Sequence, residues 1–251
     1  MDKHLITKNI TYLCNTIGML FLVFISAAHA TEVKTMSTEA DPHYTDGGFF
    51  DIHVCNWPGR PLFFLTLWST TKYDTLTRVE IMAPDGKKFG ELDLTKYRLL
   101  KIKNKPDKRV FIKQFDIPKG LGNGIYTAKA TFKDGKEFIA KDYVIIEAMQ
   151  RANNTHPAPN EENVPVHSTL KWDPVPGARY YQVFLRDLWL GKTILESKFL
   201  QIPELKLPDG LLQSDGLYEW RIHARDVNGH TLLGDFNHGS LTEKMEFSTA
   251  Q

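Results

Sequence analysis

The sequence has little cysteine, almost no net charge and no long hydrophobic run, and each shortage excludes a class of protein. Cys14 and Cys55 are the only two cysteines among 251 residues, which excludes a small scaffold held together by several disulfides. The formal net charge is +1, so no global field attracts nucleic acid or an anionic membrane. Hydrophobic residues make up 42% and charged residues 24%, as in ordinary globular proteins, so disorder over the whole chain is excluded.

Motifs of common enzyme classes are also missing. The sequence contains no Gly-x-Ser-x-Gly, no His-Glu-x-x-His, no phosphate-binding Gly-x-x-x-x-Gly-Lys-Ser/Thr and no dinucleotide-binding Gly-x-Gly-x-x-Gly. Carboxylates are plentiful, but no two of them lie at a sequence spacing that indicates a catalytic pair. We therefore expect a protein that is not an enzyme and needs no cofactor. A hydrolase with carboxylates far apart in sequence stays open as an alternative.

The first thirty residues have the layout of a secretory signal peptide. Lys3 and Lys8 precede an uncharged run of twelve residues from Ile17 to Ala28. Ala28 and Ala30 then supply the small residues of a cleavage site. The run is too short for a helix that spans a membrane, which needs about 20 residues. We expect residues 1–30 to be removed, which leaves an exported, formally neutral chain with Cys55 as its one cysteine and no membrane span.

The rest of the chain divides by composition. Residues 31–45 are polar and have no hydrophobic period, so we expect a flexible tail. Regular patterning covers residues 46–149, and residues 150–163, rich in Asn and Pro, interrupt it as a linker of the kind that tolerates domain motion. Patterning resumes over residues 164–250.

Both patterned halves are typical of β-strands. Alternating residues at 50–55, an apolar run at 61–71 and strands at 78–83 and 110–117 indicate sheet in the first half. Two strands flank Asp134-Gly135, a strong hairpin signal. No helix of convincing length is present. The sequence therefore predicts an all-β protein of two consecutive β-sandwich domains.

The second half has more specific features. LKWDPVPGARYYQVFL and LYEWRIHARDVNG resemble a fibronectin type III domain over about residues 164–250. The resemblance implies a core tryptophan at Trp172, inward Tyr181 and Val183, and a corner tyrosine at Tyr218. Residues 46–149 resemble a bacterial immunoglobulin-like module more loosely, through the final hairpin. Such folds carry many functions, so the resemblance implies architecture only.

The strongest candidate binding surface follows from strand alternation. If Tyr181 and Trp220 face the core, their sequence neighbours face outward, and the two strands are neighbours in a type III domain. One exposed sheet face would then carry aromatic and basic side chains, a composition found in protein interfaces. The candidate binding residues are Tyr180, Phe184, Arg186, Arg221, His223 and Arg225.

Two alternatives concern other residues. Trp57 and Trp189 lie at predicted turns, where each could stack on a sugar ring or cover a core. His53 and Cys55 share one face of a strand, so they could hold a zinc or copper ion, with His43 as a third ligand. The commoner outcome for that face is a small buried cysteine without a metal.

These features together predict an exported binding or adaptor protein of a periplasmic or extracellular assembly. A protein partner, recognised through the sheet face, is the first hypothesis. A carbohydrate-binding module that uses Trp57 or Trp189 is the second, and the hydrolase is the third.

Overall fold

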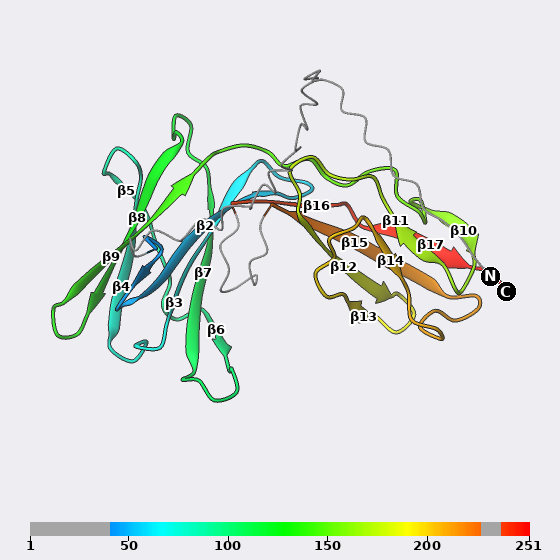
Figure 1. The fold of residues 1–251 in the computed structure, drawn as a ribbon, viewed down its shortest axis with the longest axis horizontal. Helices are drawn as coiled ribbons and strands as arrows, with labels where there is room; N and C mark the ends of the chain where they lie inside the picture. Colours follow the sequence, from blue (N-terminus) through cyan, green and yellow to red (C-terminus); the bar gives the residue numbers. More distant parts are fainter. Residues whose placement is uncertain (1–40, 227–236) are drawn as a thin grey trace, which may run out of the picture. The chain divides into compact units, whose positions relative to one another are not determined.

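The computed structural model describes residues 41–226 and 237–251 (Figure 1). The predicted signal peptide, residues 31–40 of the predicted tail and the Asn228-Gly229 turn lie outside the described residues. Within them the protein is all-β, as predicted, and no α-helix is present. This part of the chain accordingly has no helix long and apolar enough to cross a membrane.

Nine strands form the first half of the described chain. They are β1 (Tyr44–Thr45), β2 (Gly48–Asn56), β3 (Phe63–Thr70), β4 (Leu76–Met82), β5 (Lys88–Glu91), β6 (Tyr97–Leu100), β7 (Lys108–Asp116), β8 (Gly124–Phe132) and β9 (Glu137–Val144). The order β2-β3-β7-β6 forms one layer, and β5-β4-β8-β9 forms the other. Phe50, Trp68 and Tyr126 are fully buried in the core of this sandwich. Asp134-Gly135 connects β8 and β9 as predicted, and Gly135 has the positive φ that such a turn requires.

Eight strands follow. They are β10 (Glu161–Val164), β11 (Thr169–Lys171), β12 (Tyr180–Asp187), β13 (Lys192–Glu196), β14 (Glu204–Lys206), β15 (Leu217–Arg225), β16 (His238–Leu241) and β17 (Met245–Thr249). The pair β11-β14 covers a sheet that contains β12, β13, β15 and β17. Trp172, Tyr181 and Trp220 are buried in a second core between these layers, as the alternation predicted.

A tyrosine closes one corner of the second half. The backbone N–H of Gln213 donates to the Tyr218 hydroxyl at 2.8 Å, so the side chain fixes the connection before β15. Gly216 makes this possible, because a Cβ at that position would lie 2.4 Å from the Tyr218 ring. The corner role expected for Tyr218 is therefore present.

One strand pair joins the two halves and was not predicted. β16 lies parallel to β2, with His238 opposite Val54 and Gly239 opposite Cys55. Because β16 also pairs with β15, one sheet continues from β15 through β16, β2 and β3 to β7. Side chains of strands from both halves therefore share one face of this sheet.

The segment predicted as a linker, residues 150–163, is held by hydrogen bonds to its neighbours. The Arg151 guanidinium donates to the Asn56 side chain at 3.0 Å and to the Trp57 carbonyl at 2.8 Å. Its last residues belong to β10, which pairs in parallel with β17. The polar composition that suggests a mobile linker here supplies donors and acceptors that anchor the segment.

The predicted tail also ends earlier than expected. Tyr44 and Thr45 form β1 and pair with β2. The backbone N–H of Lys141 in β9 donates to the Pro42 carbonyl at 2.8 Å. The pairing satisfies backbone groups at the edge of β2, which explains why a polar segment without a hydrophobic period is ordered.

Candidate functional site

The candidate face of the second half exists with the predicted strand pairing. β12 and β15 are antiparallel neighbours, with Tyr180 opposite Arg225 and Phe184 opposite Arg221. Side chains between these positions, such as Val183 and Ile222, are buried in the core as expected. The six candidate binding residues therefore lie on one side of the sheet, opposite the core.

Their predicted exposure is wrong for two of them. Arg225 is fully buried, and His223 is 8% exposed. Tyr180, Phe184 and Arg221 are half-buried, and Arg186 is exposed. β15 is an inner strand with β12 and β16 as neighbours, and Phe199 packs on Arg225, so these inner residues of the face are buried.

Arg225 is held by its neighbours within the sheet. Its guanidinium carbon lies 4.5 Å from the centre of the Phe199 ring, a cation–π contact. The guanidinium donates to Gln182 Oε1 at 3.3 Å and lies 3.0 Å from His223 Nδ1. Arg225 thus stabilises the sheet, and it is not accessible for partner recognition.

Burial also changes the charge of this cluster. It lowers the pKa of His223 to about 3, and the positive charge of Arg225 contributes to that shift. Burial likewise lowers the pKa of Arg225, to about 10. His223 is therefore neutral, and Arg225 stays charged at physiological pH. Arg221 is also engaged, because it donates to the Thr242 carbonyl at 3.0 Å and 3.2 Å.

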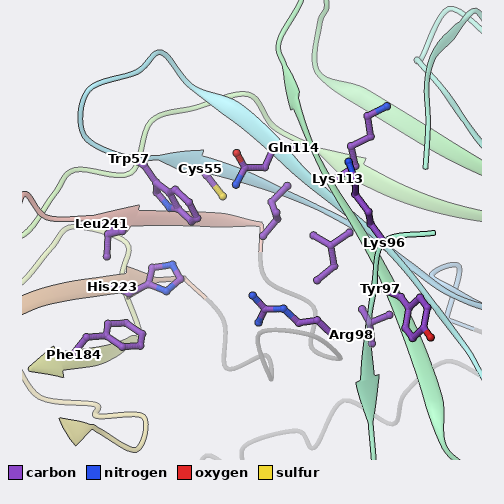
Figure 2. Close-up of a pocket in the computed structure, with 13 residues that line it drawn as sticks. Cys55, Trp57, Lys96, Tyr97, Arg98, Lys113, Gln114, Phe184, His223 and Leu241 are labelled. Carbon is purple, nitrogen blue, oxygen red and sulfur yellow. The ribbon is translucent and has the colours of Figure 1, made fainter. Parts of the chain in front are cut away.

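Beyond β16 the same face forms a pocket of about 540 Å³ (Figure 2). Its walls come from both halves of the chain and are mainly apolar. Residues that line it are Cys55, Trp57, Leu65, Lys96, Tyr97, Arg98, Val110, Ile112, Lys113, Gln114, Phe184, His223 and Leu241. Of the sequence candidates, the pocket brings together Phe184, His223, Trp57 and Cys55.

Arg98 provides the charge that faces this pocket. In Figure 2 its guanidinium points inward from β6, whereas the Lys113 and Tyr97 side chains extend away. Arg98 is exposed. It forms no ion pair with any residue in the described ranges 41–226 and 237–251. A cation without a carboxylate partner beside apolar walls suits a ligand that carries both an acidic and an apolar group.

The two tryptophan candidates lie in different surroundings. Trp57 is half-buried in the pocket wall, and its ring packs edge-on against Phe63 with centroids 5.0 Å apart. Trp189 is 73% exposed on the turn between β12 and β13, and it does not line the pocket. They do not form a common platform for a sugar.

His53 and Cys55 lie on the face of β2 opposite the core residues Ile52 and Val54, as the alternation predicts. His53 Nε2 lies 2.7 Å from Asp51 Oδ2, and both side chains are fully buried. Burial raises the pKa of the Cys55 thiol to about 12, so the thiol is protonated near neutral pH. The thiol contacts the His53 carbonyl at 3.8 Å.

Sequence reasoning missed half of the pocket. Arg98, Ile112 and Leu65 reach it because β3, β7 and β6 are consecutive in the sheet. The run Phe63–Thr70 gave one signal, because it is apolar on both faces and thus predicts cover on both sides. β6 is short and exposed, so its pattern gives no comparable signal.

Comparisons with known proteins identify no family. No family and no curated protein matches the sequence. Alpha-2-macroglobulin of Escherichia coli, activated by porcine elastase, is a structural match with 12% identity and a TM-score of 0.26 over 80% of this chain. The Bacteroides ovatus mixed-linkage glucan utilization protein SGBP-B, in complex with a mixed-linkage heptasaccharide, matches with 14% identity and a TM-score of 0.21 over 77% of this chain.

The native form of the Escherichia coli macroglobulin matches with 11% identity and a TM-score of 0.25 over 84% of this chain. The chain spans 20%, 42% and 15% of these three proteins, in the order given. TM-scores this low support no functional argument.

Proposed function

We propose that this chain is an exported, non-enzymatic binding protein that recognises an acidic segment of a protein partner in the pocket between β15 and β6. The observation that carries the proposal is Arg98, which forms no ion pair with a described residue and faces an apolar pocket of about 540 Å³. The pocket volume fits one large side chain and its neighbours rather than a whole domain.

The pocket walls specify the chemistry of that segment. Leu65, Val110, Ile112 and Leu241 offer an apolar surface, and Phe184 adds an aromatic ring. An aliphatic or aromatic side chain would bury its surface there, which is the usual anchor of a protein interface. An adjacent carboxylate would accept hydrogen bonds from Arg98.

The chemistry of the described lining favours binding over catalysis. No Asp or Glu is among the pocket residues found in the described part of the chain, so no carboxylate pair for glycoside hydrolysis faces it. The lining thiol, Cys55, has a pKa of about 12, and His223 has a pKa of about 3. Neither is suited to act as a nucleophile or a general base near neutral pH.

The proposal places the protein in the periplasm or outside the cell. Its support is the layout of residues 1–30, which is typical of a secretory signal peptide. Under the same proposal, residues 164–250 form a fibronectin type III-like domain and residues 46–149 an immunoglobulin-like one. The corner formed by Tyr218 and Gln213 supports the first of these assignments.

The test is partner capture with variants of the pocket. The exported chain is immobilised and used to capture protein from the envelope fraction, with bound protein and bound glycan measured together. We expect a stoichiometric protein partner whose affinity falls about tenfold or more in Arg98→Glu and in Phe184→Ala. The loss in Arg98→Glu should shrink as salt increases, because the contact is electrostatic.

A matched control separates the pocket from general charge effects. Arg179 is also exposed but does not line the pocket, so Arg179→Glu changes the net charge equally and should leave the affinity unchanged. Equal losses in both variants, or full binding by Arg98→Glu, would remove the pocket from consideration.

Carbohydrate binding is the second candidate, and exposed Trp189 is the observation that favours it. Enriched glycan without a protein partner, with binding lost in Trp189→Ala and kept in Phe184→Ala, would support this function in place of the first.

A further inference from the structure

Three side chains from distant segments meet beside β2, and none of them is among the residues that line the pocket. His43 precedes β1, Asp51 lies in β2 and Asp142 lies in β9. One nitrogen or oxygen atom of each lies within 4.8 Å of the corresponding atoms of the other two. Asp51 is fully buried and Asp142 is 2% exposed. An imidazole and two carboxylates at this spacing are a ligand set for a divalent metal ion.

Each of the three groups is oriented by a second contact. His43 Nδ1 lies 2.8 Å from Asp41 Oδ1. The backbone N–H of Ile52 donates to Asp142 Oδ2 at 2.8 Å. Asp51 Oδ2 lies 2.7 Å from His53 Nε2. Metal ligands are commonly fixed in this way by carboxylates, backbone groups and histidines around them.

The contact between His43 and Asp142 brings a nitrogen and an oxygen that can both ligate a metal close together. The Asp41 carboxylate can only accept a hydrogen bond, so His43 Nδ1 is the donor to it. In a neutral imidazole, Nε2 then carries a lone pair, and that lone pair faces Asp142 Oδ1 at 3.2 Å. Two acceptors at this distance repel each other unless a proton or a metal ion lies between them. A metal ion held by both atoms would occupy the position between them.

The burial of two carboxylates also favours a bound cation at this position. Asp51 and Asp142 lose hydration in the fold, which is costly for ionised groups unless nearby positive charge compensates. A proton on His43 supplies one positive charge, whereas a divalent ion supplies two.

We propose that His43, Asp51 and Asp142 bind a divalent transition-metal ion, with zinc as the preferred ion. The ligand atoms would be His43 Nε2, Asp142 Oδ1 and one oxygen of Asp51. Zinc ligands lie about 2.0–2.2 Å from the ion, so small side-chain rotations would bring these atoms to bonding distance. The imidazole selects against magnesium and calcium, which prefer oxygen ligands alone.

This site replaces the pairing of His53 with Cys55 that the sequence suggested. His53 orients Asp51 in place of binding the ion, and Cys55 takes no part. The ion would connect the segment before β1 to both layers of the first sandwich, through β2 and β9. The proposal does not depend on the function assigned to the pocket.

The experiment measures metal binding by the exported chain. The protein is stripped with a chelator, its folding is checked by circular dichroism, and zinc chloride is titrated into it by calorimetry. We expect one zinc ion per chain with micromolar or tighter affinity, and a higher Tm in the presence of zinc. Manganese should bind more weakly, and magnesium and calcium should give no detectable heat.

Three variants make the result specific. Asp142→Asn and His43→Gln should abolish stoichiometric binding, although either could also weaken the fold. Asp41→Asn is the safer variant, because Asp41 is largely exposed, and it should lower zinc affinity tenfold to a hundredfold. The control is His167→Ala, which removes an exposed histidine near Asp209 and should leave binding unchanged.

Two outcomes would overturn the proposal. One is a folded wild-type chain that takes up no zinc when the zinc concentration is about 100 µM, or about ten times the protein concentration. The other is zinc binding of equal affinity in the wild type, Asp41→Asn and His43→Gln. The first would show that the cluster binds no zinc, and the second would place the bound zinc elsewhere.

Discussion

At the scale of single residues, buried hydroxyl and ring groups hold the connections of the second half in place. Tyr218 accepts a hydrogen bond from the Gln213 backbone, and Tyr181 accepts one from the Val175 backbone at 2.9 Å. Both rings lie in the core, so each tyrosine stabilises the fold by apolar burial and fixes a loop through its oxygen.

Removing one hydroxyl tests this arrangement. Tyr218→Phe keeps the ring and leaves the Gln213 N–H without its acceptor, so we expect the free energy of unfolding to fall by about 1 kcal/mol. Chemical denaturation of both proteins measures the difference. Tyr180→Phe is the control, because the Tyr180 hydroxyl contacts only Gln201 at 3.5 Å among the described residues. A loss as large in the control would contradict a special role for the corner.

At the scale of elements, His238 connects the start of β16 to both halves of the chain. Its Nδ1 lies 2.8 Å from Asp226 Oδ2, and its Nε2 lies 2.8 Å from the Ile145 carbonyl. Both partners are acceptors, so the protonated ring satisfies both contacts. The hydrogen bond to Asp226 raises the pKa of His238, against the opposing effect of burial, and the Glu147 charge contributes in the same direction as Asp226.

A raised pKa in the folded state makes this contact dependent on pH. The stabilisation is complete below the ordinary histidine pKa of about 6.5 and is lost as the pH rises through the higher value of the folded chain. We expect His238→Ala to lower the free energy of unfolding more at pH 5.5 than at pH 9, because the folded-state contact favours the protonated ring. Denaturant titrations of both proteins at the two pH values test this, and an equal loss at both would refute it.

Most elements could be predicted because their signals are local. The Asp134-Gly135 turn and the alternation in β12 and β15 depend on neighbouring residues, and both are as expected. The pairing of β16 with β2 has no local signal, since backbone hydrogen bonds between distant segments leave no periodicity in either sequence. The exposure predicted for Arg225 was wrong for a similar reason, because Phe199, which packs on its guanidinium, is distant in the sequence.

At the scale of the whole molecule, the pairing of β16 with β2 explains why only half of the pocket could be predicted. Phe184 belongs to the face that strand alternation reveals, whereas Arg98 comes from the other half of the chain. Nothing in the sequence around Arg98 indicates that it shares a pocket with Phe184. Likewise, His43, Asp51 and Asp142 become neighbours only when β9 folds back beside β2.

Limited proteolysis tests how firmly the segment at 150–163 is held in the molecule. Arg151 is bonded through its guanidinium to Asn56 and Trp57, so we expect trypsin to cleave after it slowly. Lys101 and Lys103 are exposed in the loop between β6 and β7 and should be cleaved first. Mass spectrometry of early fragments decides the order, and early cleavage after Arg151 would indicate a mobile linker instead.

The parallel pairing of β16 with β2 also has a consequence for the order of folding. β2 is made early and β16 late, so the part of the β2 edge that pairs with β16 stays unpaired until most of the chain has been made. Contacts between such distant segments form slowly, because a long loop must close first. If the protein is exported, β2 has an unpaired edge while the rest of the chain is being exported. Unfinished chains would then aggregate unless a chaperone covers that edge.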